Sequence, residues 1–582
     1  MLDSESTFTT YVVLVTVVLA SYAVRCAALP KPVDGIPYHK SSATRVLGDA
    51  PAMIQHARRH GTVFDWMVQQ AVILNSPIFQ LFLKPFSKPA IFITDPREAQ
   101  DILLRRTKDF DRSRFFKDVF GGTVPYCHVV QPTNDKFRQG RRLLADTMAA
   151  PFLNRVAAPL LHKHTLNLIE LWQVKTNATA GHAFSVADDL SYFALDSIWN
   201  VAFGSQLNSL PEEVSFLKGI SKFDIPMSRH DPIQLPKLEA NRAANSMRIL
   251  THGLDAAVTS PTPSLSHWLL SLTPSYRRAK SYKERLVQES LDDAKARLLS
   301  HMTHEDELEG ITCATDHMVR RESQAADREN RAPNYGSREA KDELFGFLVG
   351  GYDTTATTLM WSVKLIADNP YVQDKLRTVL LNTFGGEGGI RRAIPTPEKI
   401  TAIRIPYLDA VIEEVVRCAQ TASSATRVTL HETELLGYRV PKGVDVYMLS
   451  NGPGYMLSND LNETIPEHVR STSSQESKHR VPPNWASGDI SVFRPERWIK
   501  TDERGIEIFD MHAGPSMQFG AGLRGCFGKK LAYLEIRILI VLLLWTFELQ
   551  AVPEDLRGYE AFDSLTHKPR KCYVKLKGLR EL

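Results

Sequence analysis

The longest uncharged and apolar stretch of the chain lies at its N-terminus. No charged residue occurs between Ser6 and Val24, and the centre of this stretch reads YVVLVTVVL. A helix of roughly 20 apolar residues spans the hydrocarbon core of a bilayer, so the stretch is long enough for one transmembrane helix. Acidic residues precede it, whereas Arg25 and Lys31 follow it. This charge bias predicts that the rest of the chain faces the cytosol.

A cleaved signal peptide is the alternative interpretation of this N-terminal segment. Signal peptides carry their positive charge before the apolar run, whereas here the positive charge follows it. We therefore expect a membrane anchor over residues 1–28. A stiff, proline-rich hinge over residues 29–45 and one large domain over residues 46–582 follow it.

The rest of the chain changes its hydrophobic period after a short apolar region. Two runs, Ile78–Leu83 and Ala90–Thr94, flank the turn KPFSKP and predict a small hairpin. From Pro96 onward the apolar positions recur mostly with a helical period for about 300 residues. The polar stretch 301–343 predicts a surface loop with mobile parts. The polar stretch 459–489 predicts a surface insertion. The predicted fold class is mainly α with small β-sheets.

Composition and charge exclude several classes of function. The chain has 43% hydrophobic residues, and its 70 basic and 66 acidic residues leave a net charge of +4. This near-balance gives no reason to expect nucleic acid as a partner. The six cysteines are far apart and form no CxxC pair, so a disulfide framework or a zinc site has little support. Only Cys526 stands in an unusual local sequence.

The segment around Cys526 reads FGAGLRGCFGKKLA and contains glycines at the spacing GxGxxG. A dinucleotide site also needs a preceding strand and an acidic residue about 20 residues further on, after a second strand. The run LAYLEIRILIVLLLWTF follows instead and predicts one long apolar helix. The phosphate-loop pattern fails as well, because Lys529 is followed by a second lysine.

The same segment resembles the haem-binding signature of the cytochrome P-450 superfamily, Phe-x-x-Gly-x-Arg-x-Cys-x-Gly. The matching positions are Phe519, Gly522, Arg524, Cys526 and Gly528. The resemblance implies that Cys526 is the axial thiolate ligand of the iron of haem b. It also implies that Arg524 pairs with a haem propionate and that Phe519 shields the sulfur from water. Gly522 and Gly528 would let the backbone pass close to the macrocycle.

A second segment, LFGFLVGGYDTTATTLMW, is an apolar helical run with glycines, threonines and an aspartate at its centre. Each glycine costs about 1 kcal/mol against alanine inside a helix, and such local violations often mark a functional site. A kinked core helix with threonines bonded back to the backbone is the alternative. The segment is similar to the central-helix motif of the same superfamily. This similarity implies that Asp353 and Thr354 deliver protons through water, beside the small Gly350 and Gly351.

Two further segments, YLDAVIEEVVR and FRPERW, resemble structural motifs of the superfamily. The resemblance implies a triad of Glu414, Arg417 and Arg497 that holds the ligand loop. Taken alone, a glutamate and an arginine three residues apart on a helix form an ordinary solvated ion pair.

Two other arginines match superfamily positions that bind haem propionates. Arg141 lies in KFRQGRR and Arg427 in SSATRVT. Phe137 stands where the superfamily commonly has tryptophan, so one hydrogen bond to a propionate would be lost. Either arginine taken alone could be a plain surface residue.

The motifs occur in the superfamily's order, which implies a cytochrome P-450 fold with an N-terminal anchor and residues 46–582 as the catalytic domain. The implied reaction inserts one atom of dioxygen into a hydrophobic small molecule, with electrons from NADPH through NADPH–cytochrome P-450 reductase. The chain is similar in style to microsomal enzymes of filamentous fungi that tailor secondary metabolites. This implies an endoplasmic reticulum membrane location with a cytosolic catalytic domain, so the glycosylation patterns at Asn177 and Asn462 are expected to stay unmodified.

Two alternative functions remain open. One is a haem-thiolate isomerase or dehydratase that uses no external electrons, and the other is a haem-binding protein without turnover. The pair Asp353–Thr354 argues against the first alternative, because such an enzyme needs no proton relay.

Overall fold

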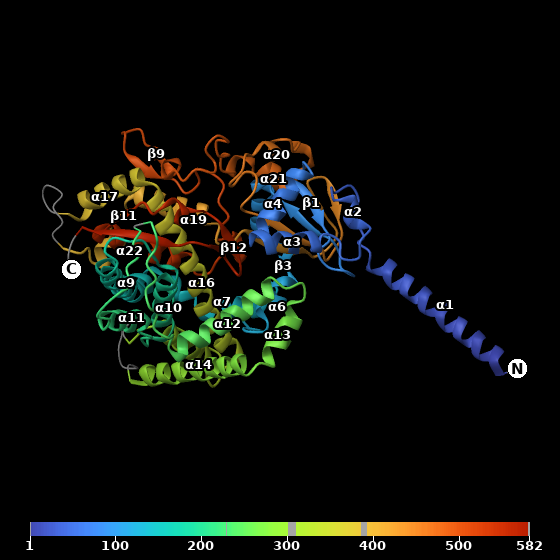
Figure 1. Cartoon of the computed structure of the whole chain (residues 1–582), viewed down its shortest axis with the longest axis horizontal. Helices are drawn as coiled ribbons and strands as arrows, with labels where there is room; N and C mark the ends of the chain where they lie inside the picture. The colour runs from blue at the N-terminus through green and yellow to red at the C-terminus, as the bar shows by residue number, and fades with distance from the viewer. Residues whose placement is uncertain (1, 229, 301–309, 386–392, 580–582) are drawn as a thin grey trace. The chain divides into compact units, whose positions relative to one another are not determined.

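The computed structural model describes residues 2–228, 230–300, 310–385 and 393–579. The chain forms two compact units, whose elements are drawn in Figure 1. Unit 1 comprises Met1–Ser113, Ser424–Val481 and Ala486–Gly488, and unit 2 comprises Arg114–Ser423, Pro482–Trp485 and Asp489–Leu582. The predicted anchor and hinge belong to unit 1, and their boundaries at residues 28 and 45 stay predictions.

Helix α1 (Leu2–Ala28) covers the whole predicted anchor. The 22 residues Thr7–Ala28 have a mean hydropathy of 1.9, and almost all of their side chains are exposed. Among the described residues, no other helix is long and apolar enough to cross a membrane. The predicted helix is confirmed, whereas its insertion into a membrane stays a prediction.

Unit 1 is built on a five-stranded sheet with the strand order β1-β2-β8-β5-β3. Strands β1 and β2 pair antiparallel with Ile78 opposite Ile93, so the predicted hairpin is confirmed. Strand β2 runs parallel to β8, and the rings of Phe79, Phe92 and Tyr447 stack across the three strands. The strands are β1 (Ile78–Leu81), β2 (Ala90–Ile93), β3 (Phe110–Arg112), β5 (Ser424–Thr429) and β8 (Asp445–Leu449). The other main elements of unit 1 are α2 (Lys40–Ala43), α3 (Ala50–His60), α4 (Phe64–Ile73), α5 (Pro96–Leu104), β6 (Thr433–Leu435) and β7 (Tyr438–Val440).

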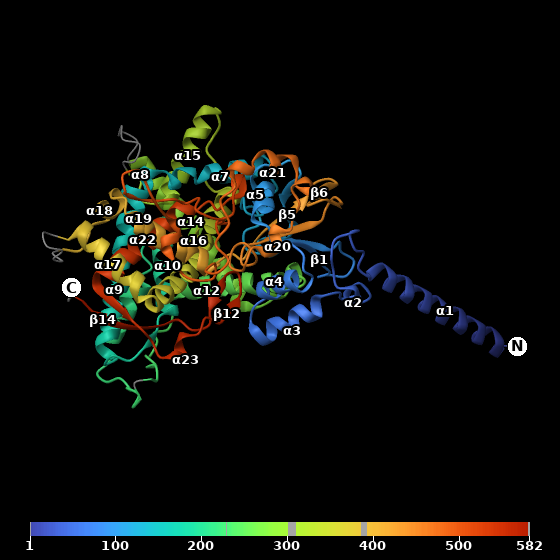
Figure 2. The ribbon, with the colours of Figure 1, turned by 90° about the horizontal axis from the view of Figure 1, so that it is seen from above.

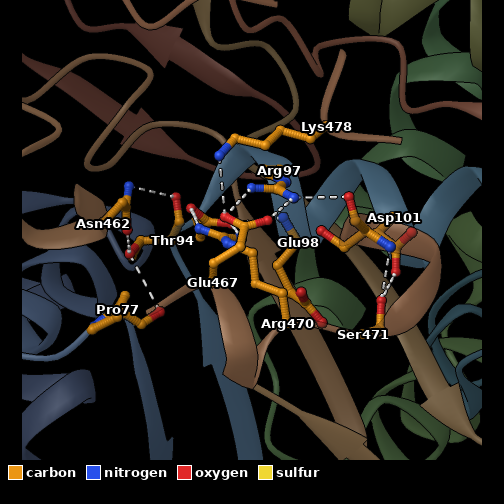
Figure 3. A network of polar contacts seen from close by, with 12 residues as sticks. Pro77, Thr94, Arg97, Glu98, Asp101, Asn462, Glu467, Arg470, Ser471 and Lys478 are labelled. Carbon is orange, nitrogen blue, oxygen red and sulfur yellow. Dashed lines mark hydrogen bonds and ion pairs between the residues drawn. The ribbon is translucent and has the colours of Figure 1, made fainter. Parts of the chain in front are cut away.

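The polar segment 459–489 turns several of its polar side chains inward, toward helix α5 (Figure 3). The buried Arg470 guanidinium bonds both oxygens of the Asp95 carboxylate, at 2.7 and 3.1 Å. The Ser471 hydroxyl donates to the Asp101 carboxylate at 2.6 Å. The predicted surface insertion is therefore anchored by a buried polar network. Its helical turns are α20 (Asp460–Glu463), η4 (Glu467–Val469), α21 (Thr472–Glu476) and η5 (Lys478–Arg480).

Unit 2 is mainly helical and is organised around α16 (Arg338–Asp368), a helix of 31 residues. Figures 1 and 2 show α16 among other helices, and it packs against α7, α10, α19 and α22. The close approach of α10 has a specific cause, because a Cβ at Gly351 would lie 2.6 Å from the Ile198 side chain. The neighbours of α16 are α7 (Asp135–Leu143), α10 (Ala187–Phe203), α14 (Pro274–Ser300), α19 (Pro406–Ala419) and α22 (Lys529–Thr546).

The remaining elements of unit 2 are shorter helices and three small sheets. The helices include α6 (Arg114–Phe120), α9 (Ala158–Ala178), α11 (Ser209–Lys218), α12 (Arg242–Val258), α13 (Pro263–Ser271), α17 (Pro370–Phe384) and α18 (Pro397–Ala402). The strands are β4 (Phe184–Ser185), β9 (Ile499–Thr501), β10 (Glu507–Phe509), β11 (Phe547–Gln550), β12 (Ala561–Asp563), β13 (His567–Pro569) and β14 (Tyr573–Gly578). They pair as β11-β14-β4, β9-β10 and β12-β13, so the predicted fold class is confirmed.

The prediction of a loop over residues 301–343 is wrong for much of that stretch. Helix α15 (Ala314–Arg328) occupies its middle, and α16 begins at Arg338. The Asp316 carboxylate accepts the backbone N–H groups of Thr312 and Cys313, which satisfies donors at the start of α15. Residues 301–309 lie outside the described residues. The high polarity of the stretch reflects an amphipathic helix, which composition alone does not separate from a loop.

The buried pair Arg470–Asp95 predicts a large effect on stability. Replacing Arg470 by methionine leaves the Asp95 carboxylate buried without its counter-charge, which costs about 3–5 kcal/mol. We expect a lower urea midpoint for the Arg470→Met protein, measured by circular dichroism. The matched control is Lys478→Met, whose side chain is 70% exposed, and a change within about 0.5 kcal/mol is expected there. Equal midpoints for the two variants would contradict the anchoring role of Arg470.

Candidate active site

The loop that carries Cys526 is shaped by backbone conformations that favour glycine. Gly520 and Gly522 have φ angles of 61° and 66°, which side chains rarely adopt. The Cys526 backbone N–H donates to the Phe519 carbonyl at 2.8 Å, which closes the loop. A Cβ at Gly528 would meet no atom within 4 Å, so the chain leaves the loop beside open space. Helix α22 begins at the next residue, as predicted.

Cys526 is exposed, yet neighbouring protein atoms desolvate its thiol and raise the pKa of the thiol. The backbone N–H of Gly528 and the positive charges of Arg141 and Lys529 act in the opposite direction and favour the thiolate. The N-terminus of α22 adds the positive end of its dipole. These thiolate-stabilising groups suit a metal ligand, because metal binding displaces the thiol proton.

Phe519 and Arg141 both lie against this loop. The Phe519 ring packs at 5.2 Å from the Tyr533 ring on α22. Arg141, on α7, donates from Nη1 to the carbonyls of Leu523 and Gly525 at 3.0 and 3.1 Å. Helix α7 is therefore tied to the loop of Cys526 by a cationic side chain.

Arg524 turns from the loop toward the segment before α7. Its guanidinium donates to the Gln131 carbonyl at 2.7 Å and to the Thr133 hydroxyl at 2.9 Å. The guanidinium carbon lies 3.7 Å from the centre of the Phe137 ring, and that of Arg141 lies 5.8 Å from the same ring. The structure thus brings the two predicted propionate ligands of unit 2 together around Phe137, and their binding to haem stays a prediction.

On α16, Gly350 and Thr354 line an open space, although most of the helix is buried. A Cβ at Gly350 would meet no atom within 4 Å, and the residue is exposed. The Thr354 hydroxyl donates to the Gly350 carbonyl at 2.5 Å. The small size of Gly351, in contrast, serves the packing of α10 through Ile198. Room for a ligand is therefore provided at Gly350 and not at Gly351.

Asp353 does not share the open environment of its neighbour. Its buried carboxylate accepts from the Lys568 ammonium at 2.6 Å and from the Thr566 hydroxyl at 2.8 Å. Thr566 also lies 2.8 Å from the Thr357 hydroxyl, which completes a network between α16 and the hairpin β12–β13. Lys568 is partly exposed, so the network reaches the surface. Lys568 and Thr566 were not predicted from the sequence, because no motif links the hairpin to α16.

The predicted triad is present and fully buried. The Glu414 carboxylate accepts from Arg417 at 2.7 and 2.8 Å and from Arg497 at 3.0 Å. The Trp498 indole donates to the same carboxylate at 2.8 Å. Since Glu414 and Arg417 are 0% and 1% exposed, the alternative of a solvated ion pair is excluded.

Arg427 belongs to unit 1, whereas the other predicted site residues belong to unit 2. It is buried on strand β5 and donates from Nη1 to the Thr426 carbonyl at 2.9 Å. Its role at a propionate stays a prediction.

The sequence matches a family model described as Cytochrome P450 over residues 54–455 and 482–576. "Cytochrome P450 monooxygenase TRI13" of Fusarium sporotrichioides is 36% identical and covers 97% of this chain and 98% of its own length. "Cytochrome P450 monooxygenase GME11363" of Pestalotiopsis microspora is 37% identical over 99% and 100%. "Cytochrome P450 monooxygenase xilC" of Penicillium crustosum is 34% identical over 98% and 97%.

Solved structures give the same answer for the fold. The crystal structure of the "cytochrome P450DA heme domain" superposes with a TM-score of 0.65 at 18% identity. The match covers 95% of this chain and 99% of that chain. At this level of identity the likeness concerns the fold alone, and the predicted cytochrome P-450 fold is confirmed.

Proposed function

Because the chain belongs to the cytochrome P450 family, we propose that it is a haem-thiolate monooxygenase acting on a hydrophobic small organic molecule. One atom of dioxygen enters the substrate, and a redox partner supplies the electrons. The observation that carries this proposal is the complete cysteine signature in a closed, glycine-shaped loop that leaves Cys526 exposed. The open space at Gly350 and Thr354 on α16 supports it independently.

The residues of this site fit a haem, and each has a proposed part in holding it. Cys526 would hold the haem iron through its thiolate, and the haem, when bound, would supply the dioxygen chemistry. The positive charges of Arg141, Arg427 and Arg524 suit the two propionates. The aromatic ring of Phe519 shields the sulfur from water.

Thr354 and Asp353 have separate parts in our proposal. The Thr354 hydroxyl holds a water molecule at the open space, where a proton is needed. Asp353 connects that position to solvent, and its contact with the partly exposed Lys568 supports this route. Each Asp353 oxygen accepts one of these two hydrogen bonds and can accept a second one from a water molecule.

We further propose a place in the cell and in metabolism. NADPH–cytochrome P450 reductase is the redox partner, and α1 anchors the chain in the endoplasmic reticulum membrane with the catalytic domain in the cytosol. The nearly full-length similarity to fungal monooxygenases supports an oxidative tailoring step in secondary-metabolite biosynthesis. Asn462 is 3% exposed, and its amide nitrogen donates to Asn459 at 2.9 Å, which agrees with an unmodified side chain.

The ligand role of Cys526 is tested by replacing it with serine. We expect the Cys526→Ser protein to lose the red-shifted absorption band of the reduced carbon monoxide complex, because serine supplies no thiolate. Difference spectra of purified protein measure this band. The control is Cys26→Ser, at an exposed position on α1, which should keep the full band. A normal band in the Cys526→Ser protein would show that another residue holds the iron.

The proton role of Thr354 separates a monooxygenase from an isomerase or dehydratase. Removing the hydroxyl in Thr354→Ala should leave haem binding intact and divert reducing equivalents into hydrogen peroxide. The measurement is hydrogen peroxide released per NADPH consumed, with reductase present. Thr358→Ala, one turn along α16, is the matched control and should behave like the wild type. An unchanged ratio at an unchanged rate would reject the proton relay through Thr354 and favour a reaction without external electrons.

A wild-type protein that shows a haem spectrum but consumes no NADPH would favour the alternative of a non-catalytic haem protein.

The orientation of the anchor is tested on intact microsomes. Because basic residues follow α1, we expect the chain beyond residue 28 to be digested by protease added to the outside. Detergent should change the pattern only for lumenal marker proteins. Protection of the catalytic domain from the protease would reverse the proposed topology. It would also place Asn177, whose side chain is exposed, in the compartment where glycosylation occurs.

A further inference from the structure

His128 and Glu343 form a hydrogen-bonded pair between α16 and the segment that precedes α7. One oxygen of the Glu343 carboxylate lies 2.6 Å from His128 Nδ1, and the other accepts the His128 backbone N–H. The Glu343 side chain is 1% exposed and that of His128 is 19% exposed. A Cβ at Gly140 would lie 2.2 Å from the Glu343 carboxylate, so α7 leaves room for this group by carrying a glycine.

A metal ion is one explanation for this pair, because Cys127 Sγ lies 3.5 Å from the same Glu343 oxygen. Two ligand atoms that bind one zinc ion, each about 2.0 Å from it, lie roughly 3.3 Å apart. A cysteine binds such an ion only as a thiolate. The nitrogen–oxygen distance of 2.6 Å is that of a hydrogen bond. Burial and the charge of Glu343 also raise the pKa of the Cys127 thiol well above its usual range. The observations therefore favour a hydrogen-bonded pair over a metal site.

The second ring nitrogen of His128, Nε2, is available for a hydrogen bond to a bound molecule. Within the described part of the chain, Nε2 has no hydrogen-bond partner, and it is not sealed from solvent. The Glu343 carboxylate accepts a hydrogen bond from Nδ1–H, which holds the imidazole ring in a fixed orientation. The direction of Nε2 is thereby fixed as well, and a hydrogen bond from Nε2–H to a carboxylate would be charge-assisted.

The surroundings of the ring identify the chemical class of that ligand. The His128 ring lies 6.1 Å from the Phe137 ring and 6.0 Å from the ring of Phe527, which directly follows Cys526. Arg524 and Arg141 lie over the same two rings, at 3.7 Å from Phe137 and 5.4 Å from Phe527. Two guanidinium groups and one imidazole therefore surround two apolar rings beside the cysteine loop. This set of groups suits the edge of an apolar macrocycle that carries carboxylates.

We infer that His128 Nε2 donates a hydrogen bond to a haem propionate and that Glu343 is the positioning residue that orients the imidazole. This inference rests on the proposed function. Phe137 carries no polar hydrogen, and His128 adds a donor beside the guanidinium groups of Arg524 and Arg141. Glu343 bonds Nδ1 and the backbone N–H of His128, so it acts on the propionate through His128.

The test compares His128→Phe, His128→Gln and Glu343→Gln with the wild type, all as haem-loaded full-length protein. The first readout is the rate of haem transfer to excess apomyoglobin, and the second is the propionate-bending band in the resonance Raman spectrum. Loss of one charge-assisted hydrogen bond should accelerate haem loss by about tenfold or more in His128→Phe. His128→Gln keeps a neutral donor and should lie between that variant and the wild type. Glu343→Gln should shift the Raman band in the same direction, and it provides the test if His128→Phe does not fold.

His162→Phe is the matched control, because His162 is also partly buried and bonds only a backbone carbonyl, at 2.9 Å. It should leave both readouts unchanged. A wild-type rate and Raman band in both His128→Phe and Glu343→Gln would overturn the inference. One equivalent of zinc in the wild-type protein, lost in Cys127→Ser, would overturn it as well and would establish the metal site. Failure of the proposed function looks different, since the wild type itself would then lack the thiolate-type carbon monoxide band.

Discussion

The buried carboxylate of Glu414 fixes the part of unit 2 that leads to the cysteine loop. It accepts hydrogen bonds from Arg417 and Arg497, from the Trp498 indole, and from the backbone N–H of Arg494. A charge this deep is tolerated only when its hydrogen-bonding capacity is filled, because desolvation otherwise outweighs the attraction between the ions. The four donor residues, one on α19 and three in the segment 489–498, together fill this hydrogen-bonding capacity. Helix α19 and the segment 489–498 are thereby locked together, and the chain then continues through β9 and β10 toward Cys526.

Helix α16 shows how one element serves both packing and chemistry. Gly351 lets α10 approach, whereas Gly350, one position earlier, opens space beside the Thr354 hydroxyl. Asp353 turns to the β12–β13 hairpin, and Glu343 near the start of the helix turns to His128. The polar residues of this helix therefore point in different directions and have separate partners. The buried hydroxyls of Thr357 and Thr358 and the buried carboxylates of Asp353 and Glu343 are tolerated because they are hydrogen-bonded.

The features that the sequence predicted well depend on local spacing. The anchor helix and the β1–β2 hairpin follow from apolar runs and turn residues within short segments. The triad was predicted through the resemblance to the superfamily, because Arg497 lies 83 residues after Glu414. The signature around Cys526 likewise predicted a glycine-shaped loop followed directly by a helix. The features that it missed depend on contacts between distant segments. Lys568 lies 215 residues after Asp353, and only the fold brings their charges together.

Polar composition alone also gave incomplete predictions for two stretches, because a stretch can be polar for more than one reason. Helix α15 has a polar face for solvent, and the segment 459–489 is polar because some of its side chains satisfy buried groups of α5. Both stretches have the composition of a loop. Hydrogen-bond partners, which composition does not contain, decide between a solvated loop and a polar element that is packed against the fold.

The contact between α5 and the inserted segment constrains how this chain can exchange parts with its relatives. Residues 456–481 lie outside the region that matches the family model, yet they carry Arg470, the counter-charge of Asp95. A chimaera that takes α5 from this chain without the insertion, or the insertion without α5, buries one charge with no partner. The two segments must therefore be exchanged together, although more than 300 residues separate them in the sequence. Recombination that preserves folding must transfer both or neither.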